Sequence, residues 1–196
     1  MIPAPFLFSG SGESVTDNKE IIELHIHPET AYHEYLFSDE VYGEFLQYSE
    51  GTNLEKRLLL CPGESFSNFN YKKGFHYVIK ATKITLKHSP HKDINVIFEY
   101  IETISKKIAN KQDSYSEITM EVAPVMISFI PRESEPKLAY LVKTADENRP
   151  RPVTRIIGFK FKKGYTYRLR VYRSISYPPL PYSEQFQLLE VMSQHK

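Results

Sequence analysis

The 196-residue sequence contains no tryptophan, one cysteine and only eight glycines. A single cysteine excludes an intramolecular disulfide. The low glycine count, beside 13 prolines, is not that of a fibrous or low-complexity chain. No apolar run reaches the roughly 20 residues that a membrane-spanning helix needs. We therefore expect an ordered globular protein with no transmembrane segment in this chain.

The first residues lack the features of an export signal. MIPAPFLFSGSGES has neither the basic start nor the long apolar centre of a signal peptide. Residues 1–19 are rich in proline, serine and glycine, which predicts a flexible N-terminal tail. The chain as given is expected to be either cytoplasmic or the mature form of an exported precursor.

The common catalytic motifs are missing as well. The sequence has no phosphate-binding Gly-rich loop, no Gly-x-Ser-x-Gly elbow and no His-Glu-x-x-His pattern. Cys61 follows three leucines, which favours a buried thiol over a nucleophile. We expect a non-catalytic protein without a cofactor.

The residues that are abundant point to β-structure. Tyrosine (14) and phenylalanine (12) are frequent, and 41% of residues are hydrophobic. Aromatic side chains suit the half-buried surface of a sheet. The net charge of +1 conceals an acidic stretch, residues 1–110, and a basic stretch, residues 111–196. These two stretches could attract one another, or the second could meet an acidic partner. A mixed solvated surface is the alternative.

One phrase occurs twice in the chain. FNYKKGFHYVIKATK begins at Phe69, and FKFKKGYTYRLRVYR begins at Phe159. The alternation of period two predicts strands, and Lys-Lys-Gly predicts tight turns at Gly74 and Gly164. Each copy is expected to form a short strand, a turn and a longer strand. The core faces of the longer strands are predicted to be Phe75, Tyr77, Ile79 and Ala81, and Tyr165, Tyr167, Leu169 and Val171.

The similarity extends to both sides of this phrase. Residues 22–28, 43–49 and 98–106 match residues 118–124, 138–144 and 186–194 in the same order. A helix over 94–108 is possible by spacing, but its short, proline-preceded partner favours a strand. The prediction is an all-β protein of two tandem modules, residues 20–108 and 114–196. Each has about five mainly antiparallel strands in a small barrel-like or sandwich unit.

The second copy, IIGFKFKKGYTYRLRVYRSISYPP followed by FQLLEV, resembles a family signature. It is similar to an uncharacterised bacterial envelope domain, a domain of unknown function often found beside META domains in secreted or lipid-anchored proteins. The signature maps onto Ile156 or Ile157, and onto Gly158, Phe159, Phe161, Gly164, Tyr165, Tyr167, Leu169, Val171, Pro178, Pro179, Leu189, Glu190 and Val191.

The first copy departs from this signature, since Asn68 replaces the glycine of the Gly-Phe pair and Ala81 replaces a valine. We therefore interpret the first copy as a diverged duplicate of the second. The resemblance implies a periplasmic or outer-membrane-associated location, with a lipid tether in the precursor as one option. It implies no established activity.

A basic and aromatic surface is predicted on the second copy. The outward positions of its longer strand carry arginine and tyrosine, and lysines precede the turn. Such a surface could hold an anionic glycan or a protein, and single-stranded nucleic acid is a weaker alternative. Solvated charge and ion pairs between the modules would also explain these residues. The predicted ligand residues here are Lys160, Lys162, Arg168, Arg170 and Tyr172.

The loop SYPPLPY adds Tyr177 and Tyr182 to the predicted ligand site. Three prolines between two tyrosines form a stiff aromatic ledge that suits a partner, although such loops also simply end strands. We expect a non-catalytic binding or structural protein of the cell envelope with a protein or glycan ligand. A nucleic-acid-binding β-barrel protein is an alternative.

The segment ELHIHPE suggests a second alternative, a surface metal site. In a strand, His25 and His27 would share the outer face with Glu23, opposite Leu24 and Ile26. Two imidazoles at this spacing can bind zinc or copper. Two solvated surface histidines would look the same in the sequence.

Overall fold

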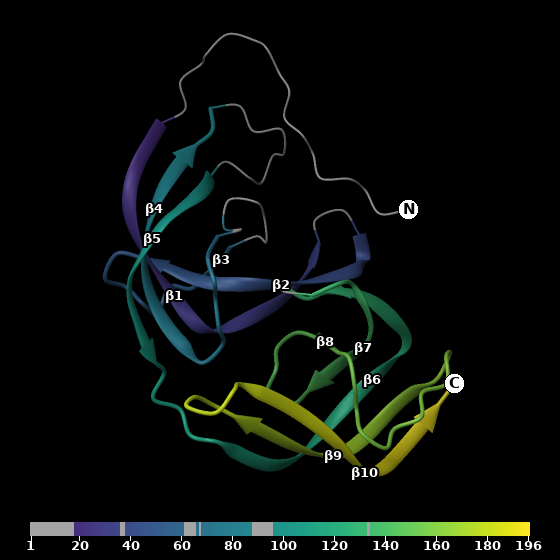
Figure 1. The fold of residues 1–196 in the computed structure, drawn as a ribbon. Coiled ribbons are helices and arrows are strands. Elements are labelled where there is room, and N and C mark those ends of the chain that lie inside the picture. Colours follow the sequence, from purple (N-terminus) through teal and green to yellow (C-terminus); the bar gives the residue numbers. More distant parts are fainter. Residues whose placement is uncertain (1–17, 36–37, 61–65, 67, 88–95, 133) are drawn as a thin grey trace.

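The computed structural model describes residues 18–35, 38–60, 66, 68–87, 96–132 and 134–196 (Figure 1). Cys61, residues 1–17 of the predicted tail and most of the loop 87–93 lie outside the described residues. Strands make up 68% of the chain, and the described part contains no helix. It accordingly contains no helix long and apolar enough to cross a membrane. The predicted all-β class is confirmed.

Ten strands follow one another along the described chain. They are β1 (Asn18–Tyr35), β2 (Ser38–Glu50), β3 (Leu58–Leu60), β4 (Phe75–Thr85), β5 (Val96–Ile108), β6 (Ser114–Ile130), β7 (Lys137–Thr144), β8 (Arg151–Val153), β9 (Thr166–Ser176) and β10 (Ser183–His195). The strands predicted over 22–28, 43–49, 98–106 and their three matches are all present. The helical alternative for 94–108 is wrong, because β5 is a strand.

The first five strands and the last five pair among themselves in one pattern. In the first set β1 lies between β2 and β4, β3 adds to β2, and β5 adds to β4. In the last set β6 lies between β7 and β9, β8 adds to β7, and β10 adds to β9. All of these pairs are antiparallel. Figure 1 shows the first set in the upper part of the molecule and the last set in the lower part.

The irregularities of the two sets also correspond. The register between β1 and β2 shifts over residues 27–29, and the register between β6 and β7 shifts over 123–125. The outer strands β5 and β10 each contain two extra residues relative to their neighbours. Such bulges bend a strand and increase its twist. The extra residues are Ile101 and Ile104 in β5, and Leu189 and Met192 in β10.

The two sets join through three parallel pairs between β2 and β6, from Val41↔Ser128 to Gly43↔Ile130. The resulting mixed sheet follows the order β10-β9-β6-β2-β1-β4-β5 and is not closed. A small buried cluster that includes Tyr42, Phe129 and Ala139 covers this junction. The closed barrel that we considered for each module is therefore not formed by the described strands.

The predicted short strands before the two glycines are wrong. Residues 69–71 and 159–161 belong to no strand, although their rings pack onto the sheet. Phe69 meets Tyr77 edge to face at 5.1 Å, and Phe159 meets Tyr167 in the same way at 5.0 Å. Ring packing at this separation stabilises the segments without strand pairing. The alternating aromatic residues thus mark a covering segment of each core.

The predicted turn glycines are confirmed, since the φ angles of Gly74 and Gly164 are 84° and 87°. Each glycine N–H donates to a proline carbonyl 2.8 Å away, and the residue two positions earlier donates its N–H to a tyrosine hydroxyl. The groups involved are Pro28, Lys72 and Tyr77 around Gly74, and Pro124, Lys162 and Tyr167 around Gly164.

Alternation of buried and exposed residues on the longer strands follows the prediction. In β9, Tyr167, Leu169 and Val171 are buried while the residues between them are exposed. In β4, Tyr77, Ile79 and Ala81 are buried, while Val78 and Lys80 between them are half-buried.

Candidate ligand-binding cleft between the two sets of strands

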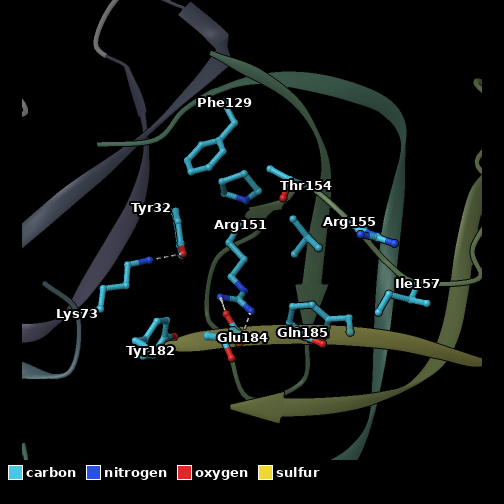
Figure 2. A pocket seen from close by; sticks show the side chains of 14 residues that line it. Tyr32, Lys73, Phe129, Arg151, Thr154, Arg155, Ile157, Tyr182, Glu184 and Gln185 are labelled. Carbon is cyan, nitrogen blue, oxygen red and sulfur yellow. Dashed lines mark hydrogen bonds and ion pairs between the residues drawn. The ribbon is translucent and has the colours of Figure 1, made fainter. Parts of the chain in front are cut away.

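Two neighbouring cavities lie where the two sets of strands meet, with volumes of about 440 and 590 Å³. Both fall within the range of about 300–1,000 Å³ typical of small-molecule sites. They share Lys73, from the turn before β4, and Tyr182, from the loop before β10. We call them together the cleft, and the smaller cavity is drawn in Figure 2.

Lys73 is held between the two cavities by groups of the first set. Its ammonium forms an ion pair with Glu44 and lies 3.4 Å from the hydroxyl of Tyr32. The same ammonium lies 5.4 Å from the ring centroid of Tyr182, within reach of a cation–π interaction. Burial by itself would lower the pKa of Lys73. The interactions with Tyr32 and Glu44 have the larger effect, so the pKa of Lys73 is raised above its usual value. Lys73 therefore presents a fixed positive charge to the cleft.

Glu44 is oriented by several donors. The Thr30 hydroxyl donates to it at 2.8 Å, and the backbone N–H of Arg132 donates at 3.2 Å. Burial opposes ionisation, yet Lys73 and these hydrogen bonds hold the pKa of the Glu44 carboxyl below its usual range. Because Arg132 belongs to the last set, this carboxylate also ties the two sets together.

On the other side of the smaller cavity, Glu184 holds two guanidinium groups. Arg151 donates to both of its oxygens, at 2.9 and 2.7 Å, and Arg173 donates at 2.8 Å. Burial opposes its ionisation, but the two arginines keep the pKa of Glu184 below its usual range. Nε of Arg151 also lies 3.0 Å from a carboxylate oxygen of Glu147, an ion pair without hydrogen-bond alignment.

The Arg151 guanidinium lies beside two aromatic rings, with centroids 5.7 Å away for Tyr32 and 5.4 Å for Phe186. Figure 2 shows Tyr32 and Lys73 on one side of Arg151, whose guanidinium points toward Glu184. The arrangement combines fixed positive charges, aromatic faces and hydroxyl groups from both sets of strands. Such a lining can bind a polar ligand through hydrogen bonds and ring contacts.

Of the predicted ligand residues, only Tyr182 lines the cleft. It packs against Tyr177 at 5.6 Å, and burial raises its pKa to about 12. The three prolines of the predicted ledge, Pro178, Pro179 and Pro181, form a wall of the larger cavity together with Leu180. The loop thus faces the first set of strands across the cleft.

Five of the other predicted ligand residues are exposed, and Tyr177 is half-buried. Arg168, Arg170 and Tyr172 lie on the outer face of β9, whereas Lys160 and Lys162 lie in or next to the segment 159–161, whose rings pack on the buried face. Arg170 lies 3.9 Å from Glu117 and 3.1 Å from Glu190, so neighbouring carboxylates offset its charge. The Tyr172 ring stacks on that of Tyr115 at 6.3 Å. Lys160, Lys162 and Arg168 are exposed, and none of the five lines the cleft.

The prediction that His25 and His27 share an exposed face is wrong, because His27 is 3% exposed. Its Nε2 lies 2.7 Å from the Ser49 hydroxyl, which donates to the Lys56 carbonyl at 2.9 Å. The turn that follows β2 therefore covers this face of β1. No group of three or more histidine, cysteine or acidic residues suited to a metal occurs in the described part of the chain.

His27 is predicted to make stability depend on pH. Burial, reinforced by Arg57, His76 and His25, lowers the pKa of His27 from 6.5 to about 4. Its Nδ1 has no hydrogen-bond partner among the described residues, so a proton there would be buried unpaired. The unfolded chain binds this proton more readily, so stability is complete above pH 6.5 and falls towards pH 4.

At about 1.4 kcal/mol per pKa unit, the loss reaches roughly 3 kcal/mol. It is measured by urea unfolding between pH 7 and 4. The variant His27→Gln should give a flatter profile over this range. His76→Gln is the comparison variant. The pKa of His76 is also lowered, so His76 makes stability depend on pH in the same direction as His27. Equal slopes for the wild type and His27→Gln would contradict the assignment.

The fold and the cleft define an all-β protein with polar and aromatic cavities between two sets of strands. Comparisons with protein-family models, curated proteins and solved structures found no match. The function is therefore argued from the cleft itself.

Proposed function

We propose that this protein is a non-catalytic binding protein that holds a protein or glycan ligand in the cleft. The observation that carries the proposal is the shared position of Lys73 and Tyr182, which join two cavities of ligand size lined by both sets of strands. Small-molecule and glycan sites commonly lie at such junctions.

The charged groups of the cleft support binding through fixed charges. Lys73 is held protonated by Glu44, and Glu184 is held ionised by Arg151 and Arg173. General acid–base chemistry favours a group whose pKa lies near the working pH. Charges that do not change near neutral pH suit recognition better than proton transfer.

The two sets of strands are, in this proposal, diverged copies of one five-strand module. Their identical pairing patterns, corresponding bulges and equivalent turn hydrogen bonds support this origin. The resemblance over Gly158–Val191 supports a place in the bacterial cell envelope. A cleft between two copies would give the protein a site that neither copy has alone.

A glycan and peptide array tests the proposal. The labelled protein is applied as wild type, as Tyr182→Ala, and as the double variant Arg168→Ala with Arg170→Ala. We expect the wild-type signals to fall about tenfold or more in Tyr182→Ala, because an aromatic anchor of a binding site contributes on the order of 2 kcal/mol. The double variant should retain the signals, since both arginines lie outside the cleft.

Circular dichroism establishes that each variant is folded. Signals that depend on the two arginines and survive Tyr182→Ala would place the ligand on the outer face of β9 and contradict the cleft. A folded wild-type protein that binds no probe on either array would contradict the proposed function.

A further inference from the structure

We infer that the ligand of the cleft is an anionic oligosaccharide, whose acid group is a carboxylate or a phosphate. This inference rests on the proposed function and adds the class of ligand. It follows from the charge of the lining, from two cations that have no ion-pair partner among the described residues, and from the combination of aromatic rings with small polar groups.

The lining of the cleft is positive. Among the described residues, five cationic side chains and two carboxylates line the two cavities, which gives these residues a formal charge of +3. Arg173, Glu147 and Asp146 form ion pairs within the same network, and adding their charges gives a formal charge of +2. The cations are Lys72, Lys73, Arg132, Arg151 and Arg155, and the carboxylates are Glu44 and Glu184.

Two of these cations are available to a ligand. Lys72 lines the larger cavity and Arg155 lines the smaller one, and both are exposed. Neither side chain has an ion-pair partner among the described residues. Lys73 and Arg151, by contrast, are held by carboxylates. The cleft therefore offers one uncompensated cation in each cavity, on either side of the shared Lys73 and Tyr182.

The placement of one such cation in each cavity favours a ligand with acid groups along its length over a single small anion. Ammonium and guanidinium groups both pair with carboxylates and phosphates. A ligand that spans both cavities can place one acid group near Lys72 and another near Arg155. Its middle part would then lie over Tyr182.

The uncharged lining favours a sugar over a peptide. Tyr32, Phe129 and Tyr182 line the smaller cavity together with the hydroxyl and amide side chains of Thr154, Ser183 and Gln185. Tyrosine combines an apolar face with a polar tip. Sugar rings have one apolar face and a rim of hydroxyl groups, so they match this combination of aromatic and small polar side chains.

Isothermal titration calorimetry with the full chain tests the inference. The probes are tetragalacturonate, its fully methyl-esterified form and a mannose pentasaccharide that carries one phosphate. Maltotetraose is the neutral sugar, and hexaglutamate is the acidic peptide. We expect at least one acidic sugar to bind about tenfold or more tightly than the two neutral sugars, with an affinity that falls as salt rises. Comparison of the carboxylate and phosphate sugars distinguishes the two sources of charge.

Charge-reversal variants locate the effect. Lys72→Glu and Arg155→Glu should each weaken binding of the acidic sugar about fivefold or more, and together about thirtyfold. The matched controls are Lys162→Glu, at the position equivalent to Lys72, and Arg168→Glu. Both controls are exposed and lie outside the cleft, so they should leave the affinity within about twofold of the wild type.

The acidic part of the inference would be overturned if neither tetragalacturonate nor the phosphorylated pentasaccharide bound more tightly than the two neutral sugars, and the proposed function would still stand. Tighter binding of hexaglutamate than of any sugar would overturn the sugar part. Failure of all acidic sugars to bind would overturn the inference as a whole. The array with Tyr182→Ala separately decides whether the cleft binds any ligand.

Discussion

The variant Gly74→Ala is expected to lose far more stability than Gly164→Ala, although the two glycines occupy equivalent turns. Their φ angles of 84° and 87° impose a similar backbone penalty on alanine, about 1–2 kcal/mol. The surroundings differ. A Cβ at position 74 would lie 2.4 Å from Cδ of Pro178, whereas a Cβ at position 164 would have no atom within 4 Å.

The contact at Gly74 joins the two sets of strands, so the chain has little freedom to relieve it. The N–H of Gly74 is bonded to Pro28, its carbonyl accepts from Ala109, and Pro178 belongs to the proline loop of the last set. Overpacking of this kind costs a further 1–3 kcal/mol or so. We expect losses of roughly 2–5 kcal/mol for Gly74→Ala and 1–2 kcal/mol for Gly164→Ala.

Urea unfolding of both variants and the wild type measures this difference. Equal losses would show that Pro178 does not press on Gly74 and would contradict the described packing of the two sets. Since Pro178 also lines the larger cavity, Gly74→Ala should weaken ligand binding as well, while Gly164→Ala should not.

The second large effect is expected for Glu184→Gln. The side chains of Glu184, Arg151 and Arg173 are only 12%, 11% and 18% exposed. Removal of the carboxylate charge leaves two guanidiniums in poor contact with water and without their shared partner. Breaking a buried ion pair by removing one partner costs about 3–5 kcal/mol, and we expect a loss of this size.

Glu190→Gln is the matched control, because Glu190 pairs with Arg170 on an exposed surface. Exposed pairs contribute about 0–1 kcal/mol, so this variant should be nearly as stable as the wild type.

The lowered pKa of Glu184 also makes the stability of the protein depend on pH. Its stabilisation is present above the ordinary value of 4.5 and is lost as pH falls below it, and Glu184→Gln should lack that part of the profile. Comparable losses for both variants would contradict the role of Glu184.

The strands could be predicted from the sequence where the alternation of residues within one strand reveals its buried face. Alternation in Tyr167, Leu169 and Val171 identified the buried face of β9, because each residue contributes its side chain to one face of the sheet. The same argument failed at Phe159 and Phe161, where alternating rings pack onto the core from a segment without strand pairing. Alternation of side chains does not reveal whether the backbone has a partner.

The burial of His27 and the position of the cleft depend on contacts that are distant in sequence. Ser49 and the turn beyond it cover His27, which no local pattern indicates. Arg151 stands in a polar stretch and gains its role only because Glu184 lies opposite it. Tyr182 was predicted as a ligand residue from its proline-rich loop, and the first set of strands supplies the other wall of its site.

The most direct test of the central claim is a crystal structure of the protein with the tightest ligand found on the arrays. We predict that the ligand lies in the cleft and contacts Tyr182 and Lys73 together with Arg151 or Arg155. A ligand bound over Arg168 and Arg170 on the outer face of β9, with the cleft unoccupied, would contradict the account.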